Sequence, residues 1–185
     1  MEYLEDMPEN PVGILAPSSL EFVEGLVEIW RANRIAVPLQ PAHPLEELKY
    51  IAADTNMKEF YYSHAAKDRA KEFEAATGAR GIEIKLTSNV PTGKSFAKYC
   101  LENSGEALII YTSGTTGRPK GAVLSHENLQ SQIRSLSEAW KWSASDRTLN
   151  VLPLHHVHGL INVLFCSLAN CAECELCEKF EAAEV

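Results

Sequence analysis

The strongest structural signal in the sequence is the stretch Leu108-Ile109-Ile110-Tyr111-Thr112-Ser113-Gly114-Thr115-Thr116-Gly117-Arg118-Pro119-Lys120-Gly121-Ala122-Val123-Leu124. Its apolar ends are rich in β-branched residues and predict two strands joined by a tight loop. From Thr112 to Gly121 this loop holds three glycines, four hydroxyl side chains and one lysine. Glycines let neighbouring backbone N–H groups point toward one centre, and such a concavity binds anions, phosphate above all. The stretch therefore predicts a loop that binds a polyphosphate.

The loop does not follow the Walker A pattern. That pattern requires a second glycine five positions after the first and a helix directly after the lysine. Here Pro119 stands five positions after Gly114, and Gly121 follows Lys120. A different class of phosphate loop is therefore indicated.

A cluster of histidines follows a second predicted strand, which covers residues 148–151. The sequence there reads Leu152-Pro153-Leu154-His155-His156-Val157-His158-Gly159. Three imidazoles, whose ordinary pKa is close to neutral, would form a polar cluster at the end of that strand. A metal site is the alternative, but no nearby carboxylate or cysteine completes a ligand set. For His155 a purely structural role, packed and hydrogen-bonded, also stays open.

Together the two motifs resemble the adenylate-forming superfamily of acyl-CoA synthetases, luciferases and peptide-synthetase adenylation domains. Pro153 to His156 matches the P-x-x-H element that lies beside the acyl adenylate in that superfamily. The H-x-H-G form of His156 to Gly159 is similar to the malonyl-CoA synthetase branch, which includes mitochondrial acyl-CoA synthetases. The resemblance is strong from Leu108 to Leu164 and weak from Asn56 to Asn103.

The resemblance implies, for the full-length relative, ATP-dependent activation of a carboxylic acid, malonate-type or medium-chain, to acyl-AMP and then to acyl-CoA. It implies catalytic roles for Lys120 and His156, and contacts of His156 and His158 with the acid. ATP, CoA and a small carboxylate are the implied partners, and the ligands of Mg²⁺ are expected mostly outside this chain. The residues implied to bind ATP are Thr112, Ser113, Gly114, Thr115, Thr116, Gly117 and Lys120.

The resemblance also sets an expectation about domain organisation. In relatives the segments that hold Mg²⁺, adenine and ribose, and the small domain with a catalytic lysine, follow the part that matches this chain. We therefore expect residues 1–185 to be a truncated N-terminal AMP-binding (adenylation) domain, with a connection between two subdomains at residues 87–106. The alternative function is a catalytically inactive module that binds a nucleotide or a protein partner.

Predicted strands and helices alternate along the chain, which indicates an α/β fold with a largely parallel sheet flanked by helices. The first strand covers residues 12–16. A helix follows to about Ala32, and Ser18 with Glu21 predicts a capping box at its start. After a predicted helix ending near Ala169, Cys171 stands where the family has glycine, so we expect Asn170 to carry the cap or the cap to be lost.

Composition agrees with an ordinary globular protein, with 45% apolar and 23% charged residues. The net charge is −8 and no basic cluster exists, which argues against nucleic acid as a partner. No apolar run has the length of a transmembrane segment. The acidic start, Met1-Glu2-Tyr3-Leu4-Glu5-Asp6, argues against a presequence. We expect an intracellular protein, cytoplasmic or mitochondrial.

Three of the five cysteines, Cys171, Cys174 and Cys177, have C-x2-C-x2-C spacing. This spacing can hold part of an iron–sulfur cluster, but a fourth ligand and the usual following proline are missing. Alternation along a short strand explains Cys174 equally well, because free cysteine behaves as a small hydrophobic residue. We predict that this segment binds no metal.

Overall fold

The computed structural model describes residues 11–86, 96–112 and 118–177. Within them the larger sheet has the strand order β4-β3-β1-β2-β5-β6. Its neighbours pair in parallel, except that β6 runs antiparallel to β5. The strands are β1 (Val12–Leu15), β2 (Ala36–Leu39), β3 (Glu59–Tyr62), β4 (Arg80–Glu83), β5 (Glu106–Thr112) and β6 (Lys120–Ser125).

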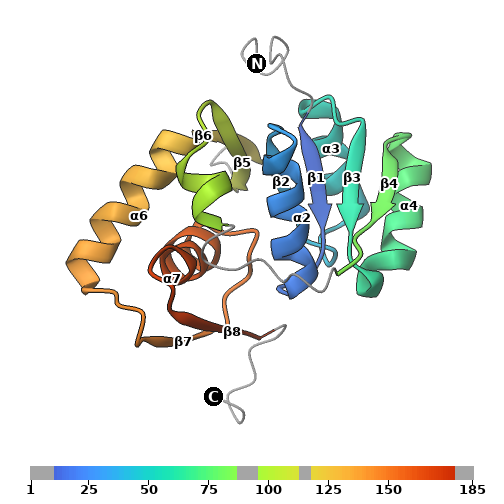
Figure 1. The fold of residues 1–185 in the computed structure, drawn as a ribbon. Helices are drawn as coiled ribbons and strands as arrows, with labels where there is room; N and C mark the ends of the chain where they lie inside the picture. The colour runs from blue at the N-terminus through green and yellow to red at the C-terminus, as the bar shows by residue number, and fades with distance from the viewer. Residues whose placement is uncertain (1–10, 87–95, 113–117, 178–185) are drawn as a thin grey trace.

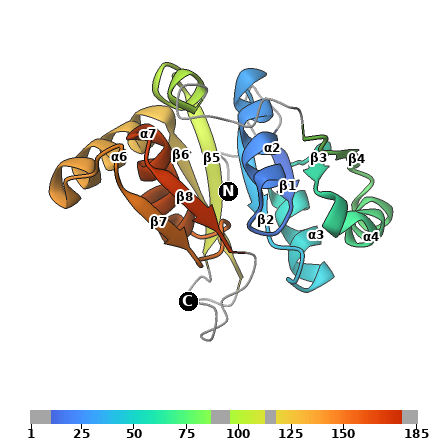
Figure 2. The same cartoon turned by 60° about the horizontal axis from the view of Figure 1, so that its bottom comes forward.

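A second, two-stranded sheet pairs β7 (Arg147–Asn150) in parallel with β8 (Glu173–Leu176). Figures 1 and 2 show it beside α7, on the opposite side of the β5–β6 hairpin from β3 and β4. The helical elements are α2 (Leu20–Arg31), α3 (Leu45–Asp54), η1 (His64–Ala66), α4 (Lys67–Thr77), η2 (Ala97–Leu101), α6 (His126–Trp140), η3 (His158–Phe165) and α7 (Cys166–Ala169).

Each face of the larger sheet packs against its own core. Successive side chains of a strand point to opposite faces. Leu108 and Ile110 of β5 therefore join the core that contains α2, α6 and η3, whereas Ile109 joins the core that contains α3 and α4. A parallel sheet covered on both faces is the usual arrangement of α/β proteins. The predicted fold class is confirmed.

Trp30 links several elements of the first core, which is the core that contains α2, α6 and η3. Its side chain is fully buried, and its indole N–H donates a hydrogen bond of 2.9 Å to the carbonyl of Ala107 at the start of β5. Its ring centroid lies 5.3 Å from that of His126 and 5.6 Å from that of Phe165. Through this one side chain, α2 contacts the strand that leads into the predicted phosphate loop.

The predicted N-cap of α2 is wrong, whereas Asn170 is the C-cap residue of α7, as one of the two alternatives predicts. Ser19, not Ser18, caps α2: it has extended backbone angles and its hydroxyl accepts a hydrogen bond from the N–H of Phe22. The helix begins one residue later than expected because the hydroxyl of Ser18 has other partners, described below. After α7 the left-handed residue is Cys171, with φ of 55°, and not Asn170.

The predicted subdomain connection at residues 87–106 is described in part. Residues 87–95 lie outside the described residues. Phe96 and Cys100 are fully buried in the core with α2 and α6, and Glu106 is the first residue of β5. The role of this segment as a connection stays a prediction.

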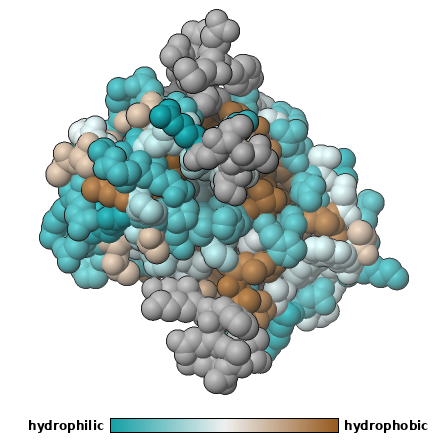
Figure 3. Space-filling model, turned by 180° about the vertical axis from the view of Figure 1, so that it is seen from behind, coloured by the Kyte–Doolittle hydropathy of each residue, from teal (hydrophilic) through white to brown (hydrophobic). Residues whose placement is uncertain are grey.

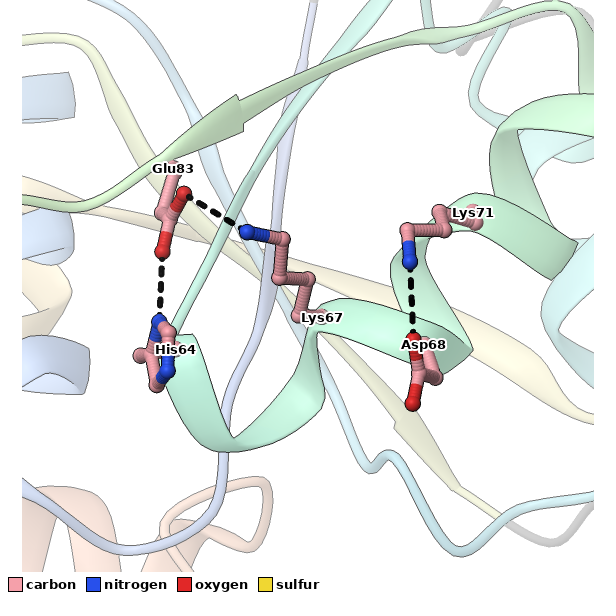
Figure 4. A network of polar contacts seen from close by, with 5 residues as sticks. All are labelled: His64, Lys67, Asp68, Lys71 and Glu83. Carbon is pink, nitrogen blue, oxygen red and sulfur yellow. Dashed lines mark hydrogen bonds and ion pairs between the residues drawn. The ribbon is translucent and has the colours of Figure 1, made fainter.

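On the face seen from behind, the described surface is mainly hydrophilic and carries scattered apolar patches (Figure 3). At the carboxyl ends of β3 and β4, Nδ1 of His64 lies 2.8 Å from a carboxylate oxygen of Glu83 (Figure 4). On the following helix Lys71 pairs with Asp68 at 2.9 Å. In the part of the chain that the structure describes, no helix is long and apolar enough to cross a membrane.

Candidate functional site

The predicted phosphate loop joins the two antiparallel strands of a hairpin, as its sequence indicates. Thr112, the last residue of β5, pairs with Lys120, the first residue of β6. Lys120 is exposed. The central residues Ser113, Gly114, Thr115, Thr116 and Gly117 lie outside the described residues, so their contacts with phosphate stay a prediction.

The histidine segment, Leu152 to Gly159, leads from β7 into η3. Asn150, the last residue of β7, is almost fully buried, and its carboxamide donates a 3.0 Å hydrogen bond to the carbonyl of Gly159. The same side chain accepts a hydrogen bond from the N–H of Leu152. A Cβ atom at position 159 would lie 2.6 Å from the carbonyl oxygen of Pro153, so the close approach requires glycine. Asn150 and Gly159 thus hold the two ends of the connection together.

A cavity of about 760 Å³ brings the two predicted motifs together. Thr112 and Arg118 line it from the hairpin, and His155 and His156 line it from the histidine segment. The remaining lining residues come from β2, from the start of α3 and its preceding turn, and from the end of the hairpin: Pro38, His43, Glu46, Glu47, Tyr50, Ile51, Tyr111 and Pro119.

Histidines gather on one wall of the cavity. The ring centroid of His155 lies 5.1 Å from that of His43 and 4.0 Å from that of His156. Burial, with the neighbouring His156 and His43, lowers the pKa of His155 from its ordinary 6.5 to about 4. His155 is therefore uncharged at neutral pH and offers one hydrogen-bond donor and one acceptor.

His43 itself has a carboxylate neighbour. Its Nδ1 lies 3.2 Å from Oε1 of Glu47, which is an ion-pair distance, although the contact does not meet hydrogen-bond geometry. The imidazole of His43 and the carboxylate of Glu47 therefore lie on the same wall of the cavity.

Two tyrosines also line the cavity. The hydroxyl of Tyr111 donates a 2.5 Å hydrogen bond to Oδ2 of Asp54, and burial together with this bond raises the pKa of that hydroxyl. The rings of Tyr50 and Tyr111 meet edge to face, and the guanidinium carbon of Arg118 lies 5.9 Å from the centroid of Tyr50. A cation this close to an aromatic face is attracted to it. Tyr50 thus contacts the side chain of Arg118, a residue of the predicted phosphate loop.

The structure brings some predicted site residues together and not others. Thr112 and His156 line the same cavity, whereas Lys120 and His158 are not among its lining residues. Nδ1 of His158 instead lies 3.2 Å from Nδ2 of Asn162 on η3. The substrate-binding role of His158 stays a prediction.

Sequence reasoning missed His43, Tyr50 and Arg118 as parts of this cavity. A usable signal exists for His43, which follows β2 closely. Strands β2 and β5 are parallel neighbours, so their carboxyl ends meet at one edge of the sheet. The order of the parallel strands therefore places the turn after β2 next to the phosphate loop.

Within the described part of the chain, no group of three or more His, Cys, Asp and Glu side chains is placed to hold a metal ion. Cys174 lies on β8 and packs against the first core beside Leu176. Burial raises the pKa of its thiol. This packing agrees with the structural interpretation of Cys174, and the absence of a metal from the cysteine segment stays a prediction.

Comparison with known proteins places the chain in a family. The family of AMP-binding enzymes matches residues 4–185. The chain therefore belongs to the AMP-binding enzymes, and the predicted membership of the adenylate-forming superfamily is confirmed.

Several relatives are malonate–CoA ligases, which confirms the similarity to the malonyl-CoA synthetase branch. One, from Arabidopsis thaliana, is 37% identical over 183 residues, covering 94% of this chain and 30% of that protein. The mitochondrial malonate–CoA ligase ACSF3 of Mus musculus is 33% identical over 184 residues, covering 97% of this chain and 32% of that protein. This chain thus spans about a third of the length of both proteins.

A solved structure of ATP-bound MatB from Rhodopseudomonas palustris has a TM-score of 0.74 to this chain at 25% sequence identity. The match covers 98% of this chain and 37% of that one. The arrangement of sheets and helices described above is therefore that of an adenylate-forming enzyme.

Proposed function

We propose that this chain takes part in ATP-dependent activation of a small carboxylic acid, of malonate type, to acyl-AMP and then to acyl-CoA. The observation that carries the proposal is the single cavity that Thr112 and Arg118 share with His155 and His156. A phosphate loop and a polar wall next to each other are what a reaction between ATP and a carboxylate requires. The names of the malonate–CoA ligases support malonate as the first acid to test.

In the first step a carboxylate oxygen bonds to the α-phosphorus of ATP, and the bond from that phosphorus to pyrophosphate breaks. In the second step the CoA thiolate attacks the acyl carbon and AMP leaves. Negative charge builds up on the phosphate oxygens during the first step. The hydroxyl of Thr112, the loop amides and the ammonium group of Lys120 would stabilise this charge if they are already oriented toward it.

The histidines need not remove a proton from the acid. A carboxylate is already ionised at neutral pH. His156, which lines the cavity, would instead orient the carboxylate by hydrogen bonding. Neutral His155 beside it would supply a fixed dipole and not a second charge.

Malonate-dependent exchange of labelled pyrophosphate into ATP tests the proposal. Lys120→Ala should lower kcat/KM for the exchange by about 10²-fold, the scale for losing one contact that stabilises the transition state. Malonate should support faster exchange than acetate or hexanoate at equal concentration.

Lys71→Ala is the matched control, because Lys71 pairs with Asp68 on α4 and does not line the cavity. We expect it to exchange at the wild-type rate. An exchange rate of Lys120→Ala within about twofold of wild type would contradict the role of the loop. ATP binding without any exchange would favour the alternative, a nucleotide-binding module.

A further inference from the structure

We propose that Ser18 is a positioning residue of the acid-activating site, whose hydroxyl sets the place of the segment that carries His155 and His156. The role of that site rests on the function proposed above. Ser18 lies in the turn between β1 and α2, more than 130 residues away in sequence from the histidines.

The hydroxyl of Ser18 bridges two backbone groups of the histidine segment. It donates a hydrogen bond of 3.5 Å to the carbonyl of Leu152 and accepts one of 3.3 Å from the N–H of Leu154. A hydroxyl can do both at once because it has one donor hydrogen and two lone pairs. The two bonds lie on either side of Pro153, directly before His155.

The hydrogen bonds that Asn150 makes with this segment act within its own part of the fold. Asn150 joins Leu152 to Gly159, and so closes the connection between β7 and η3. Ser18, by contrast, comes from the turn that follows β1 of the larger sheet. Its bridge sets the histidine wall relative to the walls that the larger sheet and α3 provide.

Ser18 is not needed to start α2, since Ser19 provides the cap. The residue that Ser18 fixes, Leu154, is 2% exposed and anchors the segment in the first core. His155 follows directly, and its ring contacts that of His43 on the same wall of the cavity. A small displacement of Leu154 would therefore move both cavity histidines away from Thr112 and Arg118.

Ser18→Ala and Ser18→Thr test the proposal, with Ser19→Ala as the matched control. The first readout is the NMR signals of the His155 and His156 imidazoles and the pH at which each titrates. Ser18→Ala should shift both signals, and the His155 titration should move toward ordinary values as its ring gains water. Ser18→Thr keeps the hydroxyl and should restore the wild-type signals, whereas Ser19→Ala should lower the melting temperature and leave them in place.

The second readout is malonate-dependent pyrophosphate exchange. Ser18→Ala should lower kcat by about tenfold, with a change in KM for ATP below about threefold, because the hairpin itself is untouched. The ring signals need no turnover, so they test the position of the histidines separately from the proposed reaction. Unchanged ring signals in Ser18→Ala, or equal changes in Ser18→Ala and Ser19→Ala, would overturn the proposal.

Discussion

At the scale of single residues, the cavity histidines are controlled by what surrounds them. His155 is half-buried between His43 and His156, and His43 has Glu47 as a neighbour. Desolvation and two further imidazoles all disfavour a charge on His155. His155 is therefore less basic than an imidazole in water.

The low pKa of His155 makes the stability of the folded chain depend on pH. The pKa of His155 is about 4 in the folded chain and takes its ordinary value of 6.5 when unfolded. Between these values the unfolded chain binds a proton that the folded chain does not, so stability is present above pH 6.5 and is lost as pH falls toward 4. His155→Gln should reduce this loss.

Urea unfolding midpoints at neutral and at mildly acidic pH measure the effect. The difference between the two midpoints should be smaller in His155→Gln than in wild type. Buried His126, whose pKa burial also lowers, is unchanged in both proteins and contributes equally. An identical pH dependence in the two proteins would show that His155 is not held neutral.

The sequence predicts individual site residues only where a motif marks them. Thr112 and His156 each belong to a recognisable pattern, and the structure places both at one cavity. His43 and Tyr50 belong to no such pattern. They join the site through tertiary contacts that no local pattern contains: the ring of Tyr50 meets that of Tyr111, and the ring of His43 meets that of His155.

At the scale of secondary-structure elements, the connection from α7 to β8 contains a strained position. Cys171 has a left-handed backbone conformation, with φ of 55°, and is exposed. For a residue with a Cβ atom this conformation costs about 1–2 kcal/mol. Glycine avoids that cost but loses more conformational entropy on folding, about 0.5–1 kcal/mol.

Cys171→Gly should therefore raise the free energy of unfolding by about 0.5–1 kcal/mol, the difference between these two terms. Chemical denaturation under reducing conditions measures it. Cys177→Ala, a change in the same segment that leaves the backbone at position 171 unchanged, is the control for loss of a thiol. A variant less stable than wild type would mean that the Cys171 side chain makes a contact that outweighs the strain.

The helix caps show why element boundaries are harder to predict than elements. Ser18 and Ser19 are adjacent and equally suited to cap a helix. The choice between them depends on Leu152 and Leu154, which are distant in sequence. The two strands that the stretch Leu108 to Leu124 predicts, whose signals are local, do form, as β5 and β6.

At the scale of the whole molecule, the site lies where parallel strands end. Within the larger sheet, β2, β1, β3 and β4 lie side by side in this order, which is typical of doubly wound folds that bind ligands at the carboxyl ends of their strands. The turn after β2 contributes His43, and the end of β5 contributes Thr112. Strand β7 then adds the histidine segment from a second sheet, so the cavity depends on how the two sheets are placed.

We propose that ATP and a small carboxylate bind beside His155 and His156. The most direct measurement follows the imidazole NMR signals of the purified 185-residue chain during titration with ATP and then with malonate. His64, which pairs with Glu83 and does not line the cavity, is an internal control. We expect saturable shifts of the His155 and His156 signals, an unmoved His64 signal, and weaker ATP binding in Lys120→Ala. Signals of His155 and His156 that stay in place at saturating ATP and malonate, or that move no more than that of His64, would contradict the proposal.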